Sequence, residues 1–98
     1  MHARHVTVSG PSEKIDEGIR SVREEVFPVL QDCDGFRGQL LLVDRQKAEI
    51  IGISLWDSEE DMVASEEKVH QARQSTAEQV GGSAPEVRLY ELPVFETN

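Results

Sequence analysis

The sequence predicts an α+β domain with the element order β-α-β-β-α-β, on three observations. Two long helical patterns repeat apolar residues at intervals of three and four. They alternate with four short segments rich in β-branched and other apolar residues, of which the middle two are joined by a short polar loop, as in a hairpin. The length of 98 residues matches one domain, so residues 1–98 are expected to share one core.

The first strand and the first helix are predicted on either side of Pro11. β-Branched residues at 4–10 precede it, and Pro11 suits the first turn of a helix, where its missing N–H is not needed. The apolar stripe of this helix comprises Ile15, Ile19, Val22, Val26, Val29, Leu30 and Cys33. Pro28 predicts a kink or an early end, because its ring clashes with the carbonyl group of Glu24.

The two central strands are predicted at residues 36–43 and 48–56. Neither strand alternates cleanly between apolar and polar residues, so both faces of the sheet are partly apolar. Leaving residues such as Leu41 and Ile51 in water would forfeit roughly 1.5 to 3 kcal/mol each. Both faces are therefore expected to be covered.

The second helix is predicted to begin at Ser58 and to end before the glycine pair at 81–82. Ser58 with Asp61 three residues later resembles a capping box. The expected buried stripe comprises Met62, Val69, Ala72, Thr76, Ala77 and Val80. A last strand is predicted within residues 85–96, and Pro93 places its far end at a sheet edge or beyond the ladder.

This order is that of ferredoxin-like domains, in which a four-stranded antiparallel sheet carries two helices on one face. The other face of this sheet is too apolar to be left in water. A second copy of the chain is expected to cover it, so that two such sheets form a dimeric barrel in a homodimer.

Composition disfavours several classes of function. The formal net charge of -9 would repel nucleic acid and anionic membranes, so neither is an expected partner. Cys33 is the single cysteine, which excludes an internal disulfide and a cysteine-based metal cluster, and it is expected to be a small apolar residue near a helix end. No segment has the length of a membrane span or a signal core, so a cytoplasmic protein is expected.

The junction between the third strand and the second helix carries a family resemblance. Trp56 ends a strand, Asp57 and Ser58 follow, and Glu59 and Glu60 begin a helix. In this junction and in its element order, the chain resembles the antibiotic biosynthesis monooxygenase-like family of the dimeric α+β barrel superfamily. The resemblance implies an obligate homodimer with a pocket in each subunit, between the sheet and the helices.

The resemblance also implies candidate activities. Family members include cofactor-independent enzymes that oxidise aromatic polyketides with O2, haem-degrading enzymes, and quinol or aldehyde-linked oxygenases. The haem-degrading members depend on an asparagine in the first strand and on a tryptophan and a histidine on the second helix. Here the first strand has Arg4, His5 and Thr7, and Ser65 stands at the position of that tryptophan, so haem degradation is not expected. The implied function is a small monooxygenase that acts without metal, flavin or other cofactor on an aromatic or quinone-like compound. The alternative is a non-catalytic dimeric module that binds a small apolar ligand or serves as an accessory or stress-related protein.

Two histidines are the candidate catalytic residues. His70 matches a histidine of some family members and could act as a general base on a phenol or an activated carbon, although a half-exposed helix histidine gives the same pattern. His5 either points into the barrel or the pocket, or is a structural, hydrogen-bonded histidine. His2 and His5 would lie on opposite faces of a strand, so no metal site is predicted.

Three further residues are candidate ligand-binding groups. Arg37 pairs either with an anionic substrate or with Glu49 across the hairpin. Trp56 either packs under the second helix or contacts a ligand with its indole N–H. Tyr90 either donates its hydroxyl to a bound carbonyl or lies at the rim of the dimer.

The enzyme and the non-catalytic module predict different pockets. An enzyme should have a pocket large enough for a ring system, with His70 or His5 and Tyr90 converging on it. A non-catalytic module should have a collapsed pocket filled by Trp56, Met62 and Phe27, with the histidines turned outward.

Overall fold

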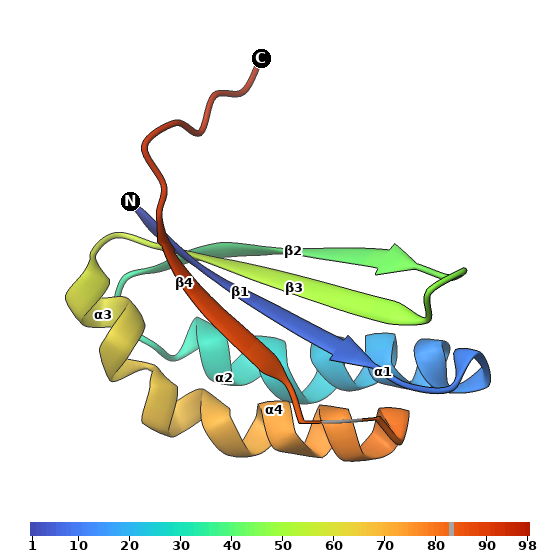
Figure 1. The fold of residues 1–98 in the computed structure, drawn as a ribbon. Helices are drawn as coiled ribbons and strands as arrows, with labels where there is room; N and C mark the ends of the chain where they lie inside the picture. The colour runs from blue at the N-terminus through green and yellow to red at the C-terminus, as the bar shows by residue number, and fades with distance from the viewer. Residues whose placement is uncertain (83) are drawn as a thin grey trace.

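The computed structural model describes residues 1–82 and 84–98 and shows one antiparallel sheet of four strands with all helices on one face (Figure 1). The strand order is β2-β3-β1-β4, which confirms the predicted ferredoxin-like arrangement. The strands are β1 (His2–Ser9), β2 (Phe36–Asp44), β3 (Glu49–Trp56) and β4 (Glu86–Glu91). The helices are η1 (Ser12–Lys14), α1 (Ile15–Ser21), η2 (Val22–Val26), α2 (Phe27–Gln31), α3 (Glu59–Ala64) and α4 (Glu66–Val80).

The first helical segment changes type before Pro28. It begins as a short 3-10 turn, continues as α1, widens into the π-helix η2 and returns to α-helix in α2. The N–H of Phe27 donates to the carbonyl of Val22, five residues back. Pro28 then lies in the first turn of α2, where its missing N–H is tolerated. The predicted disturbance is therefore a π-helical turn, and the helix does not end at Pro28.

The second helical segment is divided at Ser65 into α3 and α4, where the sequence pattern predicts one helix. The predicted cap is confirmed, because the backbone N–H of Asp61 donates to the Ser58 hydroxyl at 3.1 Å. The Ser65 hydroxyl donates to the carbonyl of Met62 at 2.6 Å, a local bond of the kind that bends helices. Gly81, with φ of 75°, ends α4 in the left-handed conformation that glycine adopts readily.

The core consists of two hydrophobic clusters between the sheet and the helices. The first cluster is Val8, Ile15, Ile50, Ala77 and Val80. The second is Leu30, Cys33, Trp56, Met62 and Val69. Trp56 is fully buried, as expected for a residue packed under the second helix, and Cys33 is the small buried residue that was predicted.

The opposite face of the sheet carries exposed apolar side chains. Within residues 1–82 and 84–98, no helix covers this face (Figure 1). Leu40 and Leu42 are 44% and 49% exposed, and Tyr90 is also exposed. We call this surface the open face. Beyond β4, the N–H of Leu92 donates to the carbonyl of Met1, and Pro93 follows outside the ladder, as one of the two expectations had it.

Candidate functional site

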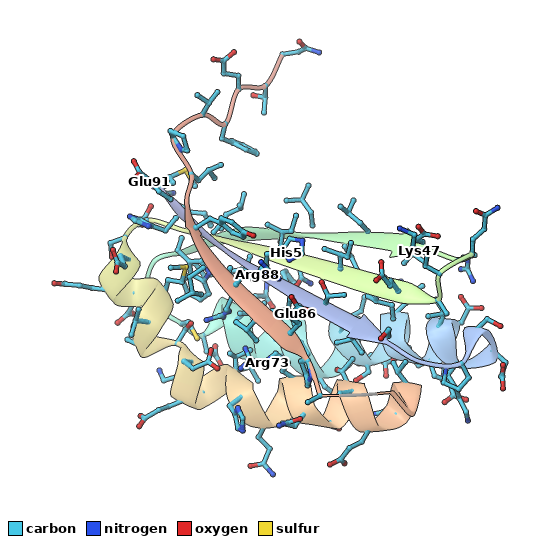
Figure 2. All side chains as sticks on the ribbon, viewed as in Figure 1. His5, Lys47, Arg73, Glu86, Arg88 and Glu91 are labelled. Atoms are coloured by element: carbon cyan, nitrogen blue, oxygen red, sulfur yellow. The ribbon has the colours of Figure 1, made fainter. Side chains whose placement is uncertain are left out.

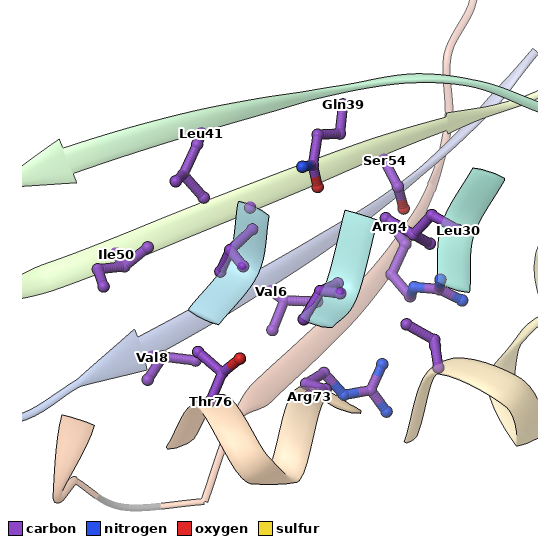
Figure 3. Close-up of a pocket in the computed structure, with 14 residues that line it drawn as sticks. Arg4, Val6, Val8, Leu30, Gln39, Leu41, Ile50, Ser54, Arg73 and Thr76 are labelled. Carbon is purple, nitrogen blue, oxygen red and sulfur yellow. The ribbon is translucent and has the colours of Figure 1, made fainter. Parts of the chain in front are cut away.

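A cavity of about 60 Å³ lies between the helices and the sheet (Figure 3). The sheet side of its lining consists of Arg4, Val6, Val8, Gln39, Leu41, Ile50, Gly52 and Ser54. The helix side consists of Val22, Val26, Leu30, Val69, Arg73 and Thr76. These residues include members of both core clusters, so the cavity lies where the two clusters meet.

The strand register sorts the sheet side of the cavity into a polar row and an apolar row. Arg4 and Gln39 are both cross-strand partners of Ser54, so these three polar residues lie side by side on β1, β3 and β2. The next row in the same direction is Val6, Gly52 and Leu41. The cavity therefore has one polar end and an otherwise largely apolar lining.

Gly52 contributes to the cavity by lacking a side chain. A Cβ atom built there would meet only the Leu41 Cδ1, at 3.8 Å. Its neighbours in the row, Val6 and Leu41, carry side chains on the same face. The glycine thus leaves open the centre of the sheet side of the cavity.

Arg4 and Arg73 are buried at this site, with 2% and 7% of their surfaces exposed. Arg4 comes from β1 and donates through Nη1 to the carbonyl of Met62 (3.1 Å), to the Ser65 hydroxyl (2.9 Å) and to Glu66 Oε2 (3.5 Å). Arg73 comes from α4 and donates through Nη1 to Glu66 Oε2 at 3.2 Å and through Nη2 to Glu66 Oε1. Two guanidinium groups thus share one carboxylate.

Burial and the presence of two arginines beside one carboxylate change the pKa values of Arg4 and Glu66. Burial lowers the pKa of Arg4, and the attraction of Glu66 does not outweigh that effect; repulsion from Arg73 lowers it further. For Glu66, burial raises the pKa, but the hydrogen bond from Arg73 and the charges of both arginines together lower it below the usual range. The site therefore holds a carboxylate firmly ionised and retains an excess positive charge.

Trp56 contacts both Arg4 and Ser54. Its indole N–H donates to the Ser54 hydroxyl at 2.8 Å, and the Arg4 guanidinium lies 5.2 Å from the centroid of its ring. Trp56 itself does not line the cavity. The contacts that the structure shows make it a residue that positions Arg4 and Ser54, while ligand contact by its indole stays a prediction.

His5 and Tyr90 lie together on the open face. Their ring centroids are 6.2 Å apart with an interplanar angle of 82°, and His5 Nδ1 is enclosed without a hydrogen-bond partner among the described residues. His5 alternates along β1 with Arg4 and Val6, which line the cavity, so it projects from the other side of the sheet. Figure 2 shows His5 on the sheet and Arg73 on the helix layer.

The other two predicted site residues lie at the surface. His70 is exposed on α4 and is not part of the cavity lining. Arg37 forms an exposed ion pair with Asp57, next to a bulge in β2, and not with Glu49 as one alternative had it. The structure thus brings His5 and Tyr90 together but places neither with His70 or Arg37, and the roles proposed for these residues stay predictions.

Sequence patterns alone assigned no role in a site to Arg4, Gln39, Ser54 and Arg73, which are polar residues of the cavity lining. A signal for two of them was present: Arg4 is in phase with Val6 and Val8 on β1, and Arg73 follows Val69 by four positions on α4. Charged residues in phase with an apolar face are rarely buried unless they are paired.

Within residues 1–82 and 84–98, His, Cys, Asp and Glu side chains form no group of three or more that could hold a metal ion. None of the helices there has the length and apolar character needed to cross a membrane.

Comparison by sequence finds relatives of unassigned function. No family model matches the chain. The chain is 45% identical to the uncharacterized protein Rv2557 of Mycobacterium tuberculosis over 92 residues, which cover 94% of this chain and 41% of the relative. It is 42% identical to Rv2558 of the same organism over 84 residues, which cover 86% of this chain and 36% of the relative. The chain thus spans about two fifths of the length of the curated relatives that it matches.

Comparison by structure finds proteins of the same fold, and two of the three described below are named as monooxygenases. The ActVA-Orf6 monooxygenase of Streptomyces coelicolor, solved with the ligand nanaomycin D, matches with a TM-score of 0.78 at 10% identity and covers 99% of this chain and 92% of its own. A candidate antibiotic biosynthesis monooxygenase of Deinococcus radiodurans matches with a TM-score of 0.77 at 18% identity, covering 100% and 98%. Rv0793 of Mycobacterium tuberculosis matches with a TM-score of 0.71 at 13% identity, covering 99% and 98%. The chain therefore has the ferredoxin-like fold of antibiotic biosynthesis monooxygenases, as the resemblance implied.

Proposed function

We propose that this chain is a subunit of a homodimeric oxygenase that acts on a small aromatic or quinone-like compound in the cavity between sheet and helices. Oxidation uses O2 without metal or flavin. The observation that carries the proposal is a largely apolar cavity with a cationic end, inside a fold shared with monooxygenases. A cationic end favours the deprotonated form of a phenol or an enol, which is the form that gives an electron to O2. We also propose a cytoplasmic location, because the single Cys33 is a free thiol.

The size of the cavity sets a condition on this proposal. An engineered cavity of about 150 Å³ binds benzene, whereas this cavity measures about 60 Å³. A ring therefore enters only when the wall moves. The wall includes Leu41 on the edge strand β2, and Val22 and Val26 on the π-helix η2, a type of turn that is frequent at functional sites.

The same observations favour a second candidate, a non-catalytic dimeric module that binds a small ligand. The lining of the cavity contains neither histidine nor tyrosine, and Trp56 and Met62 are packed in the core beside it. An enzyme with this lining must receive its substrate already ionised or remove the proton outside the cavity. His5 and His70 are then the groups to test as bases.

The homodimer is proposed to form through the open face. Burying Leu40 and Leu42 against a second sheet removes apolar surface from water. Light scattering at micromolar concentration should give the mass of a dimer for the wild-type protein and that of a monomer for Leu42→Arg. The control is Val63→Arg, which changes an exposed apolar residue of α3 and should remain dimeric. A monomeric wild-type protein would contradict the dimer.

Oxygen uptake with hydroxylated naphthalenes and anthrones tests the activity. The wild-type protein should consume O2, and Gly52→Val, which fills the cavity, should reduce the rate at least tenfold. Thr7→Val introduces the same side chain in the neighbouring strand on the open face and should retain the rate. Loss of uptake in His5→Ala or His70→Ala would assign the proton transfer to that histidine, and unchanged uptake in both would remove them from the mechanism. Ligand binding without uptake would favour the non-catalytic module, and neither binding nor uptake would refute both candidates.

A further inference from the structure

We propose that the ligand of this cavity carries a carboxylate, and that the Nε–Nη2 edge of Arg4 binds this group. The inference rests on the proposed function only in using the same cavity. It adds the chemical class of the ligand and the residue that recognises it.

The first support is the unused edge of the Arg4 guanidinium. All hydrogen bonds that Arg4 donates to the described residues come from Nη1. The Nε and Nη2 groups present two parallel N–H donors, the geometry that binds a carboxylate with two hydrogen bonds. His5 Nδ1 is the only fully enclosed side-chain nitrogen or oxygen without a partner in the described chain, so the Nε and Nη2 atoms of Arg4 are not fully enclosed. Arg4 is 2% exposed and lines the cavity, and in this proposal its Nε–Nη2 edge borders the cavity.

The second support is the charge balance. Arg4 and Arg73 form their only ion pairs, among the described residues, with Glu66. Two buried cations against one anion leave one positive charge without a counterion, which is costly in an apolar environment. A ligand carboxylate would supply the missing charge. The burial that lowers the pKa of Arg4 shows that Glu66 alone does not offset this cost.

The third support is the placement of polar and apolar groups around that edge. Ser54 and Gln39 continue the row from Arg4 across the sheet and offer a hydroxyl and an amide to a second ligand oxygen (Figure 3). The adjoining row of Val6, Gly52 and Leu41 suits an apolar body. Scaled from the cavity of about 150 Å³ that holds the six carbon atoms of benzene, a space of about 60 Å³ holds roughly two to three heavy atoms. The cavity therefore accommodates a carboxylate head group. The rest of the ligand would occupy the space that opens when the wall formed by Leu41, Val22 and Val26 moves.

Glu66 shows that the site accepts carboxylates and also competes with the ligand. Its side chain already bridges the two guanidinium groups. If Glu66 is replaced by a neutral residue, both arginines lose this counterion, and a ligand carboxylate should be attracted more strongly. A purely structural role for the arginines predicts the opposite, because removal of their counterion would loosen the site.

Titration with acetate and acetamide, followed by NMR of arginine side chains and backbone amides, tests the inference at constant ionic strength. The two probes have the same shape and differ in charge. We expect acetate to shift the Arg4 Nε–H and Ser54 signals saturably and to bind at least tenfold more tightly than acetamide. Arg4→Met should abolish acetate binding. Arg88→Met should not change it, because that arginine is exposed on β4 and pairs with Glu86 (Figure 2).

The variant Glu66→Gln decides the question even if Arg4→Met does not fold. Tighter acetate binding, by threefold or more, supports the inference, and unchanged or weaker binding overturns it. Equal affinity for acetate and acetamide also overturns it while leaving the proposed cavity intact. Acetate binding with no oxygen uptake on any ring compound overturns the oxygenase proposal alone.

Discussion

Replacing Gly52 with alanine tests whether the centre of the cavity is open. The substitution adds one methyl group, whose nearest neighbour is Leu41 Cδ1 at 3.8 Å, an ordinary van der Waals distance. Gly52 lies in the central strand β3, away from the positive φ values that only glycine adopts readily. Gly52→Ala should therefore stabilise the fold.

The magnitude follows from two effects. Restricting the unfolded chain contributes about 0.4 to 1 kcal/mol at a position whose backbone alanine can adopt. Burying one more carbon contributes up to about 0.8 kcal/mol. The sum is about 0.4 to 1.8 kcal/mol, and for a domain of this size each kcal/mol raises Tm by roughly 4 to 8 °C. An increase of about 2 to 14 °C is expected.

Thermal unfolding monitored by circular dichroism measures the effect, with all proteins at the same concentration because a dimer makes Tm depend on it. Gly18→Ala is the matched control. Helix propensity favours alanine there by about 1 kcal/mol, but its Cβ would lie 2.5 Å from Ile50 Cδ1 and 2.6 Å from Val80 Cγ2. Overpacking of that kind costs about 1 to 3 kcal/mol, so Tm should fall. A lower Tm for Gly52→Ala, or a higher one for Gly18→Ala, would refute the packing described here.

Three other predictions concern the cap, the thiol and the ion pair. Ser58→Ala should lower the free energy of unfolding by about 0.5 to 2 kcal/mol in urea titration, because it removes the bond from the Asp61 N–H, and an unchanged value would show that the cap contributes nothing. Cys33 should react with a thiol reagent at pH 8 far more slowly than in urea, since burial raises its thiol pKa, and equal rates would contradict its burial. Because folding lowers the pKa of Glu66, its ion pair with Arg73 contributes stability above pH 4.5 that is lost as the pH falls through the lowered pKa. The free energy of unfolding of Glu66→Gln should therefore fall less steeply on the acid side than that of the wild-type protein, and identical pH profiles would contradict this contribution.

The fold was predictable because each element leaves a local signature. The spacing of apolar residues marks both helices, and the Ser58 cap marks the start of α3. The break at Ser65 was not predictable in this way, because the hydroxyl that bonds Met62 and Arg4 acts between α3 and a strand distant in the sequence. Likewise, Pro28 indicates a disturbance, but tertiary packing decides that a π-helical turn accommodates it.

The candidate site was less predictable, for two physical reasons. Both faces of the sheet are partly apolar, so alternation places His5 opposite Arg4 without deciding which of them faces the helices. A buried arginine is identified only when its counterion is known, and Glu66 reaches Arg4 from an element 62 positions away. A local pattern shows which face of one element a residue lies on, whereas this site depends on charges that meet across two elements, β1 and α4.

The π-helical turn at Val22–Val26 has a consequence for how this chain can vary in length. Each residue of an α-helix advances the chain by about 100° around the axis, and the wide turn accommodates one residue beyond that count. Deleting a single residue there would restore the regular winding and rotate Phe27–Gln31 by about a quarter of a revolution, which would swing Leu30 away from the sheet. The additional residue of the π-helical turn therefore sets the rotation of Phe27–Gln31 relative to α1. Its deletion would remove Leu30 from the cavity lining and leave the strands unchanged.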